Sequence, residues 1–508
     1  MCKAYRNAEE DLEKKVTILE ASCMKLETQL NFLRRISDQK RLNSELAQCH
    51  FMLLQNLQGT LLQAVSQIET AVSSIGSDGN TLKFLKLGKW KYAIFKKTLD
   101  RMMAEMEAWQ ARFDPSWYLI ILIGDSVLDP VLVESHKNRN QNPNARTDPL
   151  DTMLALRRAI EAEKVKTNTN LDFDANQLTG MERTIVMHYT SIKAVAEASS
   201  GKLLIMETIG LNGSTTCDVE NLARRLQTID PDTFGLLRCE GILRKTDPQC
   251  RSITRLDVVY RAPLCTQPPT TLRRLLVEQG NVSHNAIVNL AQQLVRSVSY
   301  IHACDFVHKN IRPEDIVLFP SPGCPIGSAY LLGFNQLRSV SQQSGHFGDS
   351  AWHRNLYRHP QRQGLRIEDT YIMQHEIYSL GVCLLEIGLW RPFVWYRYRE
   401  ADDDGGEVAV TGSAKPMQGR GLELRSKLTD KIFERAYVGD RTALVKKDLV
   451  EMARRLLPSR MGMMYTGIVE SCLTCLDEGN EDFGTHDSIT VGVRFVEKIL
   501  ARVGEIRV

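Results

Sequence analysis

The stretch from Tyr300 to Phe319 constrains this chain more than any other part of its sequence. It reads Tyr-Ile-His-Ala-Cys-Asp-Phe-Val-His-Lys-Asn-Ile-Arg-Pro-Glu-Asp-Ile-Val-Leu-Phe, so polar side chains gather around a proline between two apolar runs. Asn310 cannot act as a general base, because an amide has no proton-accepting state near neutral pH. Asp315 is one carboxylate that remains for a metal ion, and a single carboxylate would hold a water-rich magnesium ion only weakly.

This stretch resembles the catalytic loop of protein kinases, in which an Asp is the base and an Asn binds the second magnesium ion. Asn310 stands at the base position, and Asp315 stands at the metal-binding Asn position. Arg312 stands where kinases have a Lys that contacts the transferred phosphate, and we expect it at the surface or paired with a carboxylate. His308 and Pro313 keep the scaffold, and His308 is expected to hydrogen-bond backbone. The resemblance implies a kinase-like loop that lacks the residue defining the reaction.

Four further segments resemble kinase elements and occur in the kinase order. Thr271–Leu276 is similar to the short helix after the hinge, and His284–His302 to the long helix that leads into the catalytic loop. Tyr357–Gln361 resembles the A-P-E segment with Gln in place of Glu. His375–Ile387 resembles the buried helix of the large lobe, and there Glu376 stands where kinases carry an Asp that anchors the catalytic-loop backbone. The order of the segments predicts a bilobal kinase-like fold.

The nucleotide and magnesium sites of a kinase are incomplete in this sequence. At the D-F-G position the chain has Gly333 in place of the Asp that grips magnesium, whereas Phe334 keeps the hydrophobic role. No G-x-G-x-x-G occurs in residues 170–205, and no lysine lies between Lys202 and Lys245 to serve as the third-strand Lys. Nucleotide binding would then rest on adenine contacts alone. We therefore expect no cofactor, neither ATP nor magnesium, and no intact catalytic residue.

The N-terminal part of the chain has a different pattern of apolar residues. Residues 1–135 predict a helical bundle, because apolar residues recur at three-, four- and seven-residue spacings. Residues 136–168 read as a polar linker followed by a brace-like amphipathic helix. Lysines alternate with aromatic residues over 83–101. We interpret that stretch as a bundle helix with solvated lysines; docking on an anionic membrane surface is the alternative.

Residues 169–508 predict the kinase-like domain, so the fold class is α+β, a helical bundle followed by a bilobal kinase-like fold. The small lobe is expected over about 169–265 and the large lobe over about 266–508. Residues 400–421 read as a disordered insertion in the large lobe, since they are rich in Asp, Gly and polar residues. Expected β-like runs and one helix of the small lobe are Thr184–His188, Lys202–Met206, Val219–Thr228 (helical), Gly241–Arg244 and Leu256–Tyr260.

Composition sets outer bounds on the function. The 508 residues carry a formal net charge of +3 and 25% charged residues, which gives no support for nucleic acid as a partner. Twelve cysteines are scattered, and we read the one C-x-x-C, Cys472–Cys475, as a buried helical pair rather than a zinc site. The polar, helical N-terminus shows no signal peptide, so a cytoplasmic location with reduced thiols is expected.

A second resemblance covers nearly the whole chain. Lys89–Lys97 and Trp109–Ile120 resemble the helical domain of filamentous-fungal proteins that join a HeLo-type, prion-inhibition-and-propagation-like domain to a degenerate kinase domain. Leu236–Gly241, Leu331–Phe334 and Tyr357–Pro360 resemble their kinase-like part. The architecture is similar to the mixed-lineage-kinase-domain-like effector of necroptosis. The resemblance implies protein partners, peripheral membrane attachment and a role in incompatibility or cell-death signalling.

The sequence thus predicts a pseudokinase signalling protein, in which a catalytically degenerate kinase domain regulates a helical effector or adaptor domain. The alternative is an active, ATP-dependent protein Ser/Thr kinase with an atypical active site. That enzyme would have to transfer phosphate with Asp315 as its metal carboxylate and no side-chain base.

Overall fold

The structure is a computed structural model in which the chain divides into two compact units, Met1–Leu154 and Ala155–Val508. In the first unit it describes only Gln29, Lys97, Asp100, Arg101 and Ala104. The predicted bundle, the linker and most of the basic stretch 83–101 therefore lie outside the described residues. The second unit is described over 171–506, except for 179–182, 197–202, 211–215, 228, 247–252, 264–266, 279, 281, 305, 323, 340–346, 367–370, 398–414, 435–438, 481 and 484–487.

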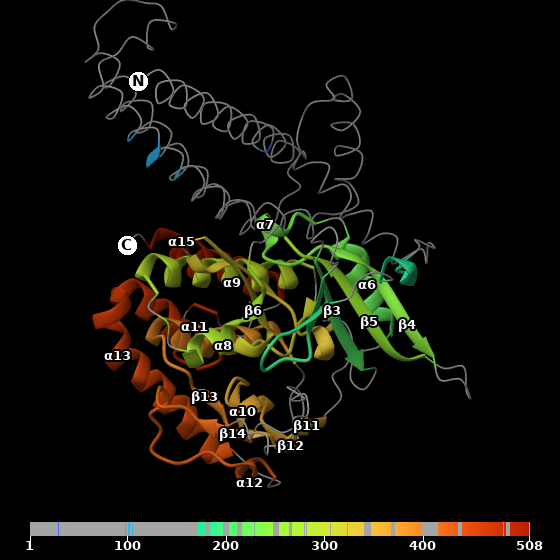
Figure 1. Cartoon of the computed structure of the whole chain (residues 1–508). Coiled ribbons are helices and arrows are strands. Elements are labelled where there is room, and N and C mark those ends of the chain that lie inside the picture. Colours follow the sequence, from blue (N-terminus) through green and yellow to red (C-terminus); the bar gives the residue numbers. More distant parts are fainter. Residues whose placement is uncertain are drawn as a thin grey trace, which may run out of the picture. The chain divides into compact units, whose positions relative to one another are not determined.

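A five-stranded antiparallel sheet forms the first part of the second unit (Figure 1). Its spatial order is β1-β2-β3-β5-β4, and the connection from β3 to β4 contains α6 (Thr216–Leu226) and the short α7 (Pro231–Phe234). The strands are β1 (Arg183–Val186), β2 (Lys193–Ala196), β3 (Leu203–Gly210), β4 (Cys239–Thr246) and β5 (Ile253–Arg261). The sequence predicted the other four strands and the helix α6 but missed β2, because Lys-Ala-Val-Ala has one β-branched residue, and lysine and alanine are depleted in strands.

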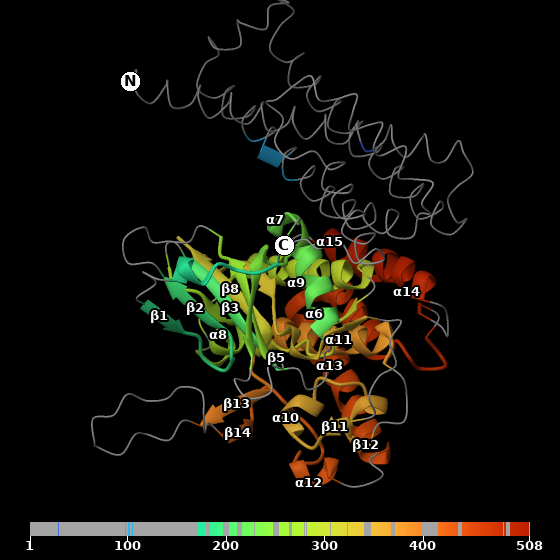
Figure 2. The same cartoon turned by 90° about the vertical axis from the view of Figure 1, so that its right-hand side faces the viewer.

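Mostly helical structure follows the sheet (Figure 2). The helices are α8 (Leu272–Glu278), α9 (His284–Ala303), α10 (Trp352–Asn355), α11 (Met373–Leu389), α12 (Asp430–Phe433), α13 (Gly439–Leu473), α14 (Ser488–Phe495) and α15 (Arg502–Glu505), with a π-helical turn at Val496–Ala501. Short 3-10 turns occur at Ala175–Leu178, Pro313–Asp315, Phe334–Gln336 and Pro360–Arg362.

Small antiparallel ladders join the loops of this helical part. A three-stranded sheet has the order β6-β8-β9, formed by β6 (Thr270–Thr271), β8 (Ile316–Ser321) and β9 (Cys324–Leu331). The two-stranded ladders are β7 (Phe306–Val307) with β10 (Arg338–Ser339), β11 (Phe347–Asp349) with β12 (Gly364–Arg366), and β13 (Val394–Arg397) with β14 (Lys415–Gln418). The β8–β9 hairpin follows the predicted catalytic loop directly, so it fixes both ends of the candidate site.

Helix α11 is the centre of the helical part, and it is buried along its whole length. Two glycines allow α13 to approach it closely. A Cβ added at Gly381 would lie 2.7 Å from Cys472 Cβ, and one added at Gly388 would lie 2.7 Å from a ring carbon of Tyr465. Since such separations are below van der Waals contact, only glycine permits this packing. The predicted run His375–Ile387 lies wholly inside α11.

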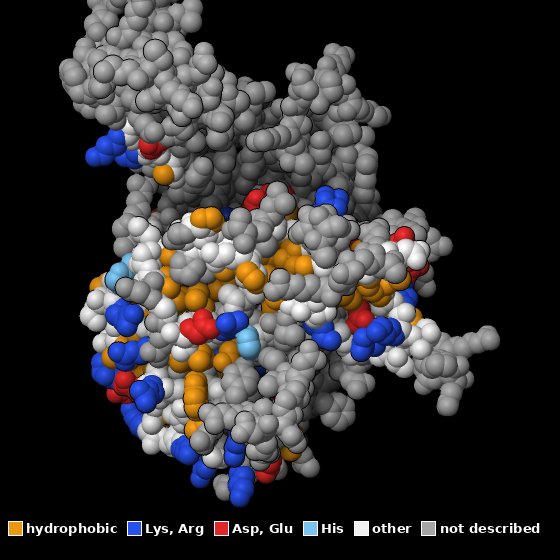
Figure 3. Space-filling view, in the orientation of Figure 1, with side chains coloured by type: hydrophobic (Ala, Val, Ile, Leu, Met, Phe, Trp, Pro, Cys, Tyr) orange, Lys and Arg blue, Asp and Glu red, His pale blue; other side chains and the backbone are white. Residues whose placement is uncertain are grey.

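The predicted disordered insertion at 400–421 is wrong over its last seven residues. Lys415–Gln418 forms β14, which pairs with β13 in the register Trp395↔Met417, and Gly419 N–H donates to Phe393 O at 2.8 Å. Residues 400–414 lie outside the described residues. The strand was missed because its order comes from pairing with β13 and not from its own sequence. One face of this hairpin stays outside, where Trp395 and Met417 are exposed and apolar side chains form a strip over β13 (Figure 3).

Within the described residues of both units, no helix combines the length and apolar character needed to cross a membrane.

Candidate functional site

The candidate site is the loop between β7 and β8, and two buried side chains hold its backbone. Glu376, at the start of α11, accepts a hydrogen bond from Lys309 N at 2.6 Å and contacts His302 Nε2 at 2.7 Å. His308 Nε2 lies 3.0 Å from Leu332 O, and Asn310 N donates to His308 Nδ1 at 3.2 Å. Both side chains thus make the backbone contacts expected for them. Lys309 takes φ +63°, a left-handed conformation that this anchoring must stabilise.

Burial keeps His308 neutral, because it lowers the pKa of the imidazole to about 4 against the opposing charge of Glu376. The ring also packs against Phe334, with 4.9 Å between ring centroids. Phe334 is fully buried and begins the 3-10 turn after β9. Pro313 is the first residue of the 3-10 turn that carries Asp315. His308 and Phe334 thus pack together, and Pro313 starts the turn that carries Asp315.

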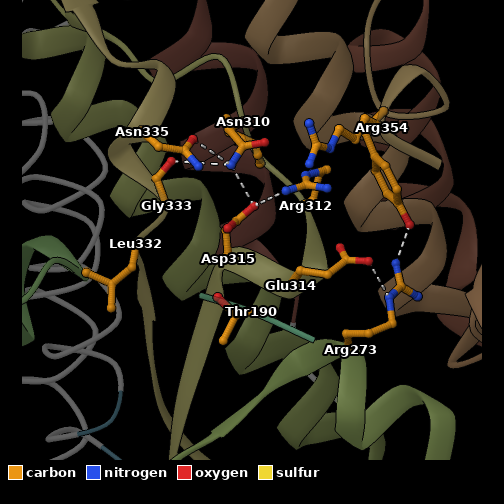
Figure 4. Close-up of polar contacts among 12 residues, drawn as sticks. Thr190, Arg273, Asn310, Arg312, Glu314, Asp315, Leu332, Gly333, Asn335 and Arg354 are labelled. Carbon is orange, nitrogen blue, oxygen red and sulfur yellow. Dashed lines mark hydrogen bonds and ion pairs between the residues drawn. The ribbon is translucent and has the colours of Figure 1, made fainter. Parts of the chain in front are cut away.

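The residues at the base and metal positions bind one another (Figure 4). Asn310 Nδ2 donates to Asp315 Oδ2 at 2.9 Å and also lies 3.4 Å from Gly333 O and 3.3 Å from Asn335 Oδ1. Arg312 Nη2 donates to the same Asp315 oxygen at 3.0 Å. Oxygen atoms are the ligands that magnesium prefers. Here Asp315 Oδ2, Gly333 O and Asn335 Oδ1 surround the amide nitrogen of Asn310. The hydrogen bonds of the cluster are therefore made within the protein, without a cation.

Gly333 leaves no space for the carboxylate that grips magnesium in kinases. A Cβ added at this position would lie 2.5 Å from both Asp315 Cγ and Asp315 Oδ1. The backbone at Gly333 also has φ +91°, which L-residues rarely adopt. An Asp at position 333 is therefore incompatible with Asp315 as it is placed. The residues present do not fit a kinase-type magnesium site.

A buried carboxyl that the sequence did not single out lies close to this cluster. Glu207, in the strand where a kinase lysine was sought, is 1% exposed, and its Oε2 accepts from the Tyr260 hydroxyl at 3.4 Å. Burial raises the pKa of Glu207 to about 8, and the negative charge of Asp315 adds to the shift. Burial also raises the pKa of Asp315 to about 7, although Arg312 opposes it. An acidic pair thus occupies the place where a kinase presents a lysine to the nucleotide phosphates.

Replacing Glu207 with Gln should change how stability depends on pH. The folded pKa of about 8 lies above the ordinary value of 4.5, so the folded protein keeps a proton that the unfolded chain releases. Stability from this group is therefore full below about pH 4.5 and is lost as pH rises towards 8. Between pH 5 and 8 the natural chain should lose this stability, whereas Glu207→Gln has no carboxyl group at position 207 and should not. The difference between their free energies of unfolding should therefore increase by roughly 1 kcal/mol per pH unit in favour of Glu207→Gln. Urea unfolding at several pH values measures it, with Glu278→Gln, at an exposed glutamate, as the control for the substitution itself.

The helix of the small sheet does not supply a partner for a catalytic lysine. Glu220 of α6 pairs with Arg244 of β4 at 2.6 Å and with Arg224 at 3.7 Å. Arg244 also pairs with Asp172. These contacts keep the Glu220 carboxylate on the β4 side, so its charge is already balanced within the small lobe.

A buried network extends from the loop into the helical part. Arg273 of α8 has no exposed surface; its Nε donates to Glu314 Oε1 at 3.0 Å, and its Nη atoms donate to Glu386 and to the Tyr357 hydroxyl. Burial alone would raise the pKa of Glu314, but Arg273 and Arg312 hold it at about 2. The Tyr396 hydroxyl of β13 donates to Glu314 at 2.9 Å. The loop residue Glu314 is therefore a fixed anion and not a free base.

Metal ligands do not gather elsewhere in the described part of the chain. Among the described residues, no group of three or more His, Cys, Asp or Glu side chains could hold a metal ion. Cys472 and Cys475 are buried free thiols, and Cys475 Sγ donates to Gln374 O at 3.1 Å. Both thiols are buried as predicted, but only Cys472 is helical, since α13 ends at Leu473 and Cys475 lies in the turn after it. Burial raises the pKa of Cys475 to about 12.

Comparison with known proteins finds relatives among protein kinases. A probable cell division protein kinase of Encephalitozoon cuniculi is 30% identical over 227 residues, which span 42% of this chain and 64% of that protein. Mitogen-activated protein kinase kinase 9 of Arabidopsis thaliana is 24% identical over 225 residues, or 37% of this chain and 69% of that protein. The mitogen-activated protein kinase kinase kinase YODA of the same plant is 26% identical over 131 residues, 25% of this chain and 13% of that protein.

No protein-family model matches the chain. The chain spans slightly less than two thirds of the Encephalitozoon protein, and all three relatives are distant. Together with the mixed helix and sheet structure, they support a protein kinase-like domain.

Proposed function

We propose that this chain is a non-catalytic signalling protein, in which a degenerate kinase-like domain regulates an N-terminal helical effector or adaptor unit. The observation that carries the proposal is the self-satisfied cluster of Asn310, Asp315 and Gly333. The amide nitrogen of Asn310 takes up the oxygens that a cation would need, and Gly333 has no room for a second carboxylate. Phosphoryl transfer depends on positioned metal ions and a positioned nucleophile, so losing both removes most of the catalysis.

Charge around the cluster supports the same proposal. A triphosphate would meet two buried carboxyl groups, Glu207 and Asp315, and neither supplies the positive charge that a lysine and a magnesium ion offer in kinases. Arg312 is the basic side chain on the cluster, and its guanidinium already binds Asp315. ATP and magnesium are therefore not part of the proposed function, and the domain acts through protein contacts.

The helical unit enters the proposal through the sequence resemblance to fungal HeLo-type proteins. Its division from the kinase-like unit at residue 154 supports a separate role for it. Protein partners are the primary proposal for this unit, with anionic membrane docking through residues 83–101 as the alternative. A role in incompatibility or cell-death signalling belongs to the same proposal.

An active protein Ser/Thr kinase is the second candidate, and the names of the three relatives favour it. Such an enzyme would use Asp315 as its metal carboxylate. The pKa of Asp315 near 7 and its bonds to Arg312 and Asn310 oppose that use, because the carboxylate is partly protonated at neutral pH and already has partners.

Incubating the full chain with radiolabelled ATP, magnesium and a general protein substrate distinguishes the two candidates. We expect no phosphate incorporation above that of Asp315→Ala, because both lack a metal site of kinase type. Kinases usually turn over at about 1–100 per second. Turnover in that range by the natural chain, abolished in Asp315→Ala, would overturn the proposal and establish the second candidate. Equal incorporation by both proteins would indicate a co-purifying kinase.

A further inference from the structure

The turn between β1 and β2, residues 187–192, replaces the glycine-rich turn of kinases with Met-His-Tyr-Thr-Ser-Ile. Its Tyr189 adopts φ +71°, in the left-handed region. That conformation costs an L-residue roughly 1–2 kcal/mol, and a bulky residue keeps it only where its surroundings impose it. The contacts that hold this turn therefore need an explanation.

Two contacts fasten the turn to the helical part of the unit. The Thr271 hydroxyl, just before α8, donates to His188 O at 2.9 Å. The ring of Tyr189 stacks on the ring of Tyr396 in β13, with 5.0 Å between centroids and 27° between the planes. An offset aromatic pair of this kind contributes about 0.5–1.5 kcal/mol beyond its buried area. The turn thus bridges the two parts of the kinase-like unit instead of standing free above the site.

The stack rests on a rigid base beside the candidate site. The Tyr396 hydroxyl donates to Glu314, the neighbour of Asp315, and Glu314 is itself held by Arg273. His353 packs edge-on against Tyr396, with 6.2 Å between the two ring centroids. In the view of Figure 4, Thr190 of the turn lies below Asp315 and Glu314.

The burial of the cluster agrees with a closed cover. Asp315 is 5% exposed and Asn310 is 7% exposed, so solvent hardly reaches the cluster while the turn is in place. Ile192 N donates to the Thr190 hydroxyl at 3.3 Å, which keeps the turn compact.

We propose that the β1–β2 turn is an autoinhibitory lid, closed by the Tyr189–Tyr396 stack, that restricts access of small molecules to the Asn310–Asp315 cluster. Any ligand or partner that uses this junction must first separate the two rings. The lid does not depend on whether the chain transfers phosphate, so its test and the phosphate-transfer assay can fail separately.

The test compares Tyr189→Gly with Tyr189→Phe in the full chain. Glycine removes the ring but suits the left-handed backbone, whereas phenylalanine keeps the ring and the strain. Hydrogen exchange read by mass spectrometry reports the turn amides. A thiol introduced by Asn335→Cys in each background reports access to the cluster through its rate of alkylation by iodoacetamide. The native Cys383, fully buried in α11, reports general unfolding.

Tyr189→Gly should speed exchange of the turn amides at least tenfold and alkylation of the introduced thiol at least fivefold, with Cys383 unchanged. Tyr189→Phe should behave like the natural chain. The lid is overturned if Tyr189→Gly leaves both rates as they were, since the backbone would then hold the turn without the ring. It is also overturned if Cys383 is alkylated faster to the same degree, because that result means general loosening.

Discussion

Replacing Arg273 with methionine should lower the free energy of unfolding by about 3–5 kcal/mol, the usual cost of removing one partner from a buried ion pair. The guanidinium is fully buried, and it neutralises Glu314 and Glu386, which are 2% and 0% exposed. Methionine fills similar space, so the loss comes from two carboxylates left without a counter-charge and not from a cavity. Equilibrium urea unfolding of the full chain, followed through the transition of the kinase-like unit, measures the change.

The next residue supplies a matched control. Arg274 is 42% exposed and pairs with Glu278 one helical turn away, so Arg274→Met should cost less than about 0.5 kcal/mol. Adding Glu314→Gln and Glu386→Gln to Arg273→Met should recover part of the loss, because the stranded charges are then gone. A cost below about 1 kcal/mol for Arg273→Met would show that the network contributes little to stability.

Local sequence patterns predicted the parts of the fold whose pattern is self-contained. The run that became α9 carries apolar residues at helical spacing and begins after Ser283, which caps it by accepting from Ala286 N. The run that became α11 is apolar on all sides, as a central buried helix requires. The expectations for His308 and Glu376 came from the resemblance to the kinase catalytic loop and to the buried helix of the large lobe.

The sequence did not allow the buried charged residues to be predicted. Arg273 looks like an ordinary surface residue of a short amphipathic helix, and its carboxylate partners lie 41 and 113 residues further along the chain. Glu207 looks like the outward residue of a half-buried strand, yet it is buried near Asp315. Charged side chains are seldom fully buried unless paired, so sequence reasoning places them outside by default. Only tertiary contacts reveal the exceptions.

Contacts between loops were equally hidden. Tyr189 and Tyr396 belong to a turn and to a hairpin that was predicted to be partly disordered, and nothing local to either residue indicates the other. The left-handed backbone at Tyr189 gives no signal either, because glycine or asparagine is the usual residue there. The candidate cluster is an intermediate case, since its residue types could be predicted but not the bonds among Asn310, Asp315 and Asn335.

Gly333→Ala should lower the free energy of unfolding by about 3 kcal/mol. Overpacking a well-packed site costs about 1–3 kcal/mol, and the left-handed backbone at φ +91° adds about 1–2 kcal/mol for an L-residue. The obstructing atoms belong to Asp315, and they cannot swing away freely because Asn310 and Arg312 bind that carboxylate. Gly333→Asp, which would restore the kinase residue, should be at least as costly because it adds a charge beside Asp315.

A double-mutant cycle separates the steric cost from the backbone cost. In an Asp315→Gly background the obstructing side chain is absent, so Gly333→Ala should cost only the backbone term of about 1–2 kcal/mol. The difference between the two backgrounds, roughly 1–2 kcal/mol, is the coupling of the two positions. Gly280→Ala is the control, since an added Cβ there meets nothing within 4 Å, and it should be nearly neutral. Equal costs of Gly333→Ala in both backgrounds would mean that Asp315 does not exclude a side chain at 333, and the argument against a kinase-type metal carboxylate at that position would fail.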